Sequence, residues 1–110
     1  MYADFGLFID GAWVKSGRQS DVISPVTEPP LGRVYTAAAT DTARAIDAAD
    51  KARAALLDMG GFGRADALHK AADAMANRAE EAAQMISRET GKPLAQSRRE
   101  WVLAVDQFRW

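Results

Sequence analysis

The feature that most constrains the fold of this chain is a long stripe of small apolar residues in its second half. The residues of the stripe recur at alternating spacings of three and four: Ala65, Leu68, Ala72, Met75, Ala79, Ala82 and Ile86. This is the period of one face of an α-helix, and it predicts a single helix over residues 64–90. Because most of the stripe is alanine, another element can approach it closely and has to supply the bulkier buried side chains.

The segment that follows this helix predicts a tight corner between two helices. Residues 89–93 read Glu-Thr-Gly-Lys-Pro. Gly91 suits the position just past a helix end, where a left-handed conformation is favoured, and Pro93 suits the first turn of the next helix. That helix is predicted over residues 93–110, and its apolar pattern continues to Trp110. We therefore expect the chain to be the front part of a longer protein.

The first part of the chain, residues 1–39, predicts a hairpin and extended segments. Asp10-Gly11 separates two short apolar runs, and this pair is a favoured two-residue hairpin loop. Val22 and Ile23 begin another extended piece, and residues 33–37 are expected to form a strand. A helix is predicted over residues 40–59, followed by the run Gly60 to Gly63, which we interpret as a turn between helices.

Composition excludes several classes of function. The formal net charge is −1, with acidic and basic residues interleaved, so neither nucleic acid nor an anionic membrane is an expected partner. The chain has no cysteine, no apolar run near the ~20 residues of a membrane span, and no basic region in Met1 to Asp10 typical of a secretory signal. The sequence predicts a soluble, cytoplasmic protein.

The residues themselves predict no active site. Gly91-Lys92 lacks the earlier glycine and the following Ser or Thr of a phosphate-binding loop, and the Gly60 to Gly63 run follows no strand. His69 is the only histidine and is interpreted as a residue on a helix surface. No nucleophile, base and orienting group can be assembled. We predict no catalytic and no cofactor-binding residues in this chain.

The order of short motifs resembles the N-terminal part of the NAD(P)-dependent aldehyde dehydrogenases. The motifs are Phe8-Ile9-Asp10-Gly11-Ala12-Trp13, Ser24 to Glu28, Leu31-Gly32-Arg33-Val34, Ala45 to Ala49, and Glu89 to Ala95. Together they cover nearly the whole chain. Within the family, the sequences of residues 27–32 and 108–110 most resemble those of the branch that contains the succinate-semialdehyde dehydrogenases.

The resemblance implies an α/β fold, cut before its Rossmann-like sheet is complete, with a β-hairpin and short strands followed by three helices. It implies oxidation of an aldehyde to a carboxylic acid by NAD or NADP, through a cysteine thioester that a glutamate helps to hydrolyse. In the family those groups lie beyond this segment, so the chain alone is expected to be inactive and to bind no cofactor. Its expected partner is the remainder of its own polypeptide, and the full-length enzyme is expected to form a homo-oligomer.

The resemblance also implies a possible site for a structural monovalent cation. It would use a backbone carbonyl near Val22 and Ile23 and the side chain of Glu100. The alternative for Glu100 is a partly buried glutamate bonded to backbone. For the whole chain, the alternative function is a free-standing helical module that binds another protein and has no catalytic role.

Overall fold

The computed structural model describes residues 6–110. The first five residues, which the sequence analysis included in the opening segment and in the search for a secretory signal, lie outside the described residues. The chain divides into two compact units. One comprises the chain up to Ile23 together with Glu28–Asp58, and the other comprises Ser24–Thr27 and Met59–Trp110. Each unit is described by itself.

The predicted hairpin is present at the start of the first unit. Strands β1 (Leu7–Ile9) and β2 (Ala12–Val14) pair antiparallel, with Ile9 opposite Ala12. Asp10 and Gly11 both have positive φ, 52° and 75°, which is the conformation that a two-residue loop of this type requires. The rings of Phe8 and Trp13 are in contact across the pair, with centroids 5.0 Å apart and planes tilted by 56°. The hairpin prediction is confirmed.

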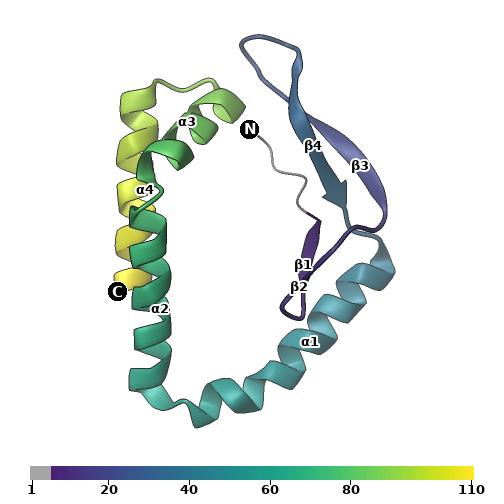
Figure 1. Ribbon diagram of the computed structural model, residues 1–110, viewed down its shortest axis with the longest axis vertical. Helices are drawn as coiled ribbons and strands as arrows, with labels where there is room; N and C mark the ends of the chain where they lie inside the picture. Colours follow the sequence, from purple (N-terminus) through teal and green to yellow (C-terminus); the bar gives the residue numbers. More distant parts are fainter. Residues whose placement is uncertain (1–5) are drawn as a thin grey trace. The chain divides into compact units, whose positions relative to one another are not determined.

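A second antiparallel pair, β3 (Arg18–Ile23) and β4 (Pro30–Thr36), follows in the same unit (Figure 1). Each strand begins earlier in the chain than the sequence analysis predicted from apolar residues alone. The additional length is accompanied by polar side chains that pair across the two strands. Arg33 donates to Asp21 at 3.0 Å, and the hydroxyls of Ser20 and Thr36 lie 3.0 Å apart. Cross-strand pairs of this kind stabilise a ladder without much apolar burial.

Helix α1 (Ala39–Asp58) matches the helix predicted over residues 40–59. Its first turn is fixed by Asp41, which is only 6% exposed. The two carboxylate oxygens of Asp41 accept bonds from the Ala38 N–H at 3.1 Å and from the Ser16 hydroxyl at 2.9 Å. The bond from Ala38 satisfies a free backbone donor at the helix start. The bond from Ser16 ties the helix to the loop after β2.

The prediction of one helix over residues 64–90 is wrong. The structure has α2 (Gly60–Ala76) and α3 (Ala79–Thr90), separated at Asn77 and Arg78. The glycine run was also misinterpreted, because it forms the first turn of α2. Only Gly60 within it has a positive φ, 67°, so one glycine makes the corner after α1 and the others are helical. Residues 6–110 therefore contain four helices where three were predicted.

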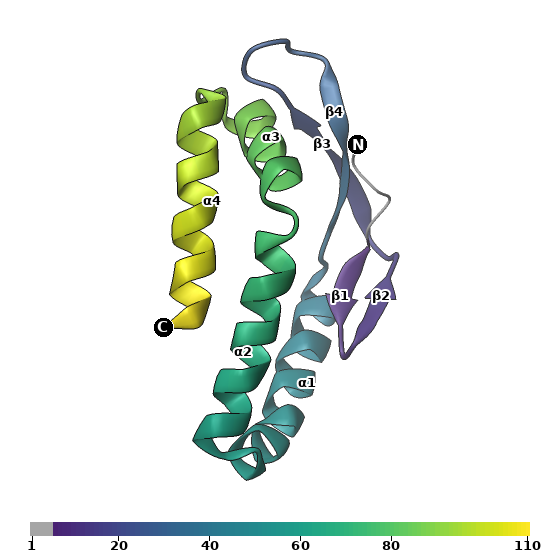
Figure 2. The same cartoon turned by 60° about the vertical axis from the view of Figure 1, so that its left-hand side comes forward.

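The corner at Gly91 is present as predicted. Gly91 has φ 73°, and its N–H donates to the Ser87 carbonyl at 2.9 Å. Pro93 has extended angles, φ −57° and ψ 140°, and lies just before α4 (Leu94–Arg109) rather than inside its first turn. After this corner α4 runs back alongside α3 and α2 (Figure 2).

The core of the second unit is small. Ala72, Ala83 and Ser97 have no exposed surface, and Val105 is 5% exposed. Of the predicted stripe, Ala72 is buried and the members from Met75 onward are half-buried, whereas Ala65 and Leu68 are exposed. Helix α4 supplies the bulk that the alanines lack, through Trp101 and Val105. The stripe is therefore covered at its centre and C-terminal part only.

Candidate functional site

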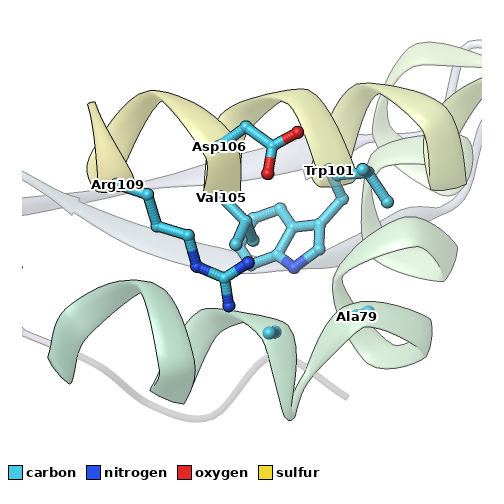
Figure 3. A pocket seen from close by; sticks show the side chains of 7 residues that line it. Ala79, Trp101, Val105, Asp106 and Arg109 are labelled. Atoms are coloured by element: carbon cyan, nitrogen blue, oxygen red, sulfur yellow. The ribbon is translucent and has the colours of Figure 1, made fainter. Parts of the chain in front are cut away.

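The most distinctive site among the described residues is a groove where the α2–α3 break faces α4 (Figure 3). It has a volume of about 210 Å³ and is lined mainly by apolar side chains: Ala76, Ala79, Trp101, Val102, Val105, Asp106 and Arg109. Trp101 is half-buried, and its indole Nε1 donates to the Met75 carbonyl at 2.9 Å. This bond is the second one that the Met75 carbonyl accepts at the end of α2, because the Arg78 N–H also donates to it at 3.1 Å.

The end of α4 is held to α2 by polar contacts. Arg109 Nη2 lies 3.2 Å from a carboxylate oxygen of Asp73, and the Arg109 carbonyl lies 3.2 Å from His69 Nε2. His69 is exposed, as expected for a helix-surface histidine. With Trp101 these contacts fix α4 against α2 at two levels, one at the break and one near Arg109.

A second set of contacts joins α3 to α4. Arg98 donates through Nε and Nη2 to the two carboxylate oxygens of Glu80, both at 2.9 Å, and Gln84 donates to Glu80 at 3.2 Å. These bonds, first from Arg98 and then from Gln84, lower the pKa of Glu80 to about 2. Glu80 also lies in the first turn of α3, where the helix dipole favours a negative charge.

The Gly91 corner packs against the turn Ser24–Thr27. The buried Ser24 hydroxyl accepts bonds from the N–H groups of Val26 and Thr27, at 3.2 and 3.3 Å. A Cβ added at Gly91 would lie 3.2 Å from Pro25 and 3.3 Å from Val26. The corner therefore needs glycine both for its conformation and for this close approach.

The two residues predicted for a cation site lie in different units. Ile23 is the last residue of β3, and Glu100 lies on α4. The interpretation of Glu100 as a partly buried residue bonded to backbone is wrong, because its side chain is exposed and forms a salt bridge with Lys92. Within residues 6–110 there is no group of three or more metal-ligating side chains. The cation site stays a prediction.

Exposed apolar side chains also lie outside the groove. They include Leu103 and Phe108 on α4, Trp110 just after it, and Leu68 on α2. No helix in the described part of the chain is both long and apolar enough to cross a bilayer. Several exposed large apolar side chains on a small structure are consistent with a surface that another polypeptide covers.

The comparisons with known proteins identify the class. The sequence profile described as "Aldehyde dehydrogenase family" matches residues 13–110. The chain belongs to this family. The D-glyceraldehyde dehydrogenase (NADP(+)) of Thermoplasma acidophilum is 36% identical over 109 residues, which are 97% of this chain and 22% of that protein. The glutarate-semialdehyde dehydrogenase of Pseudomonas aeruginosa is 35% identical over 94% of this chain and 22% of its own length.

A solved structure gives the same result for the fold. Aldehyde dehydrogenase 21 from Physcomitrella patens, in complex with the reaction product succinate, superposes with a TM-score of 0.90 at 32% identity. The match covers 96% of this chain and 22% of that one. The predicted fold class, an N-terminal part of the aldehyde dehydrogenase fold, is thereby confirmed. The chain spans about a fifth of the length of the relatives that it matches.

Sequence reasoning missed the two side chains that organise the second unit. Arg98 lies 18 residues from Glu80, and Trp101 lies 26 residues from Met75. Contacts between residues so far apart in the sequence leave no periodic signal that sequence reasoning could detect. The one available signal is Trp101 itself, because a buried indole N–H needs an acceptor and its side of α4 faces the alanine stripe.

Proposed function

We propose that this chain is part of an oxidoreductase that oxidises an aldehyde to a carboxylic acid with NAD(P)+ through a cysteine thioester. The observation that carries the proposal is the family match across residues 13–110. The 110 residues contain no cysteine, so the nucleophile has to come from another part of the polypeptide. The segment contributes structure to the enzyme and no reacting group.

The cofactor of the whole enzyme is proposed to be NAD or NADP. The name of the Thermoplasma relative, which includes NADP(+), supports a nicotinamide cofactor. For the substrate we propose an aldehyde that also carries a carboxylate group, as in the succinate-semialdehyde branch. The glutarate-semialdehyde relative and the succinate complex of the moss enzyme support this choice.

The proposed partner of the segment is the remainder of its own polypeptide. The exposed apolar residues of α4, together with Ile46, Leu56 and Leu57 on α1, support this proposal. Relatives that are more than four times longer supply ample chain to cover them. A homo-oligomer of the full-length enzyme and a cytoplasmic location stay predictions from the sequence.

The test is an assay of the full-length gene product beside the 110-residue chain. Each is incubated with NAD and with NADP and a panel of aldehydes that includes glutarate semialdehyde, succinate semialdehyde and D-glyceraldehyde, and formation of the reduced cofactor is followed. We expect turnover by the full-length protein and none by the 110-residue chain. A full-length protein in which the candidate nucleophilic cysteine is replaced by alanine is the control.

Two outcomes contradict the proposal. One is turnover by the 110-residue chain above the blank. The other is a folded full-length protein that binds neither cofactor and oxidises none of the aldehydes. The second outcome would favour the alternative, a helical module whose exposed α4 surface binds another protein.

A further inference from the structure

The break between α2 and α3 depends on the conformation of one residue. Asn77 has helical angles, φ −65° and ψ −15°, whereas Arg78 has φ −112° and ψ 19°. An ordinary helix has values of about −63° and −42°. Residues 64–90 contain neither proline nor glycine, the usual causes of a helix break. The break is therefore not caused by either of these residue types. The local contact there is between Arg78 and Glu81 in the first turn of α3, where Arg78 Nε and Nη2 donate to the two carboxylate oxygens at 2.9 Å.

The Met75 carbonyl would have different hydrogen-bond donors in a continuous helix and in the observed broken one. In a continuous α-helix it would accept a bond from the N–H of Ala79, four residues further along. In the structure it accepts from the Arg78 N–H at 3.1 Å and from the Trp101 indole at 2.9 Å. A carbonyl oxygen has two lone pairs, so these two donors fill its capacity. The regular helical ladder resumes with the Ala82 N–H, which donates to Arg78 at 3.0 Å.

We propose that residues 60–90 are a two-state element, and that Trp101 on α4 selects the broken form over one continuous helix. The continuous form is favoured locally, because the apolar stripe keeps its three-and-four spacing through Asn77 and Arg78. The broken form is favoured by α4, which places an indole donor on the carbonyl that continuity would use. Trp101 acts here as a positioning residue.

The other contacts of α4 fall into two groups. Straightening the helix at Arg78 would move α3 and α4 away from α2, so it would also break the Arg109 contacts with Asp73 and His69. The bonds between Arg98 and Glu80 lie within the α3–α4 pair and would survive. A partner that draws α4 away from α2 would therefore lengthen the helix. Arg98 provides a matched control, because its loss loosens α4 without freeing the Met75 carbonyl.

The experiment is nuclear magnetic resonance of the isotope-labelled chain, comparing the wild type with Trp101→Phe and Arg98→Ala. The reporters are the Cα chemical shift of Arg78 and the amide exchange rates of Asn77, Arg78 and Ala79. In Trp101→Phe we expect the Arg78 shift to become helical and the Ala79 amide to exchange about tenfold more slowly, as it gains a helical hydrogen bond. In Arg98→Ala we expect both reporters to stay at wild-type values.

The Arg109→Ala variant keeps the test decisive if Trp101→Phe does not fold. It weakens the hold of α4 on α2 and leaves the indole in place. We expect the Trp101 indole N–H to exchange faster and the Ala79 amide to exchange more slowly. Changes of both rates in the same direction would overturn the proposal. A folded Trp101→Phe variant that keeps the wild-type Arg78 shift would overturn it as well.

Discussion

Arg98 and Glu80 are joined by two parallel hydrogen bonds of 2.9 Å, which link α4 to the first turn of α3. Both side chains are about half exposed, so the geometry rather than burial makes the pair significant. A bidentate arrangement of this kind positions two elements more narrowly than a single ion pair does. It holds α3 and α4 as a pair that the α2–α3 break then places against α2.

The first prediction is that the contribution of Glu80 to stability depends on pH. Its pKa is lowered from 4.5 to about 2, first by the bonds from Arg98 and then by the bond from Gln84. A lowered folded-state pKa gives stability that is fully present above the unfolded value of 4.5 and is lost as the pH falls toward 2. The melting temperatures of wild type and Arg98→Ala should therefore differ above pH 4.5 and converge as the pH falls to about 2. Arg99→Ala, which changes a neighbouring exposed arginine, is the control, and an equal pH dependence in Arg98→Ala and wild type would contradict the prediction.

The second prediction compares two glycines. Gly91→Ala should lower the free energy of unfolding by about 1 to 2 kcal/mol, the usual cost of a left-handed residue with a Cβ, with a further cost from the approach of Pro25 and Val26. Gly61→Ala should raise it by about 0.5 to 1 kcal/mol, because Gly61 is helical and a Cβ there meets nothing within 4 Å. Denaturant titrations measure both values. The prediction fails if the two variants change stability in the same direction.

The third prediction concerns the start of α1. Asp41→Asn leaves one acceptor oxygen where two are used, so Ala38 and Ser16 can no longer both donate to this side chain. The charge is also lost, and any remaining contact of the amide group with the Ser16 hydroxyl is a weaker, neutral one. Bonds from Ala38 and then Ser16 lower the pKa of Asp41, so its effect should be present at neutral pH and fade in acid. We expect Asp41→Asn to lower the melting temperature more than Ser16→Ala, and to speed amide exchange at Ala38. A larger effect of Ser16→Ala would show that the tether matters more than the helix start.

The fourth prediction concerns the exposed apolar surface. Taken alone, the 110-residue chain should unfold broadly and self-associate, since its buried core is small. Leu103→Ser and Trp110→Ser should reduce the self-association seen in sedimentation velocity and leave the helical dichroism unchanged, because both side chains are exposed and lie outside the groove. Gln107→Ser on the same helix is the control. Equal association by all three variants would place the contact surface elsewhere.

Local chemistry explains which parts of the fold could be predicted. Asp10-Gly11 and Gly91 each require a conformation that few residues adopt, so the hairpin and the helical corner follow from their neighbours alone. The family could be recognised because its short motifs are themselves mostly turns and helix ends. The catalytic groups of the proposed enzyme could be expected only by resemblance, since the 110 residues contain no cysteine.

The errors arise where distant side chains decide the outcome. The break at Arg78 involves no proline or glycine, and besides the local Arg78–Glu81 pair the contacts that accompany it come from Trp101 and Arg98 on the next helix. The full length of β3 and β4 depends on cross-strand pairs such as Asp21 with Arg33. Glu100 was expected to face the backbone, but Lys92, eight residues away across the corner, is its partner.

The complete burial of Ala72 and Ala83 sets these two apart from the other alanines between residues 6 and 110. At an exposed helical alanine a larger side chain extends into water, whereas at these two positions it would push α4 away from α2 or α3. A library that samples every alanine should therefore tolerate most replacements at exposed positions and reject nearly all at these two. Among the sequences that survive selection, positions 72 and 83 should keep small residues while the exposed alanine positions vary. These two positions would then show how closely the helices must approach each other.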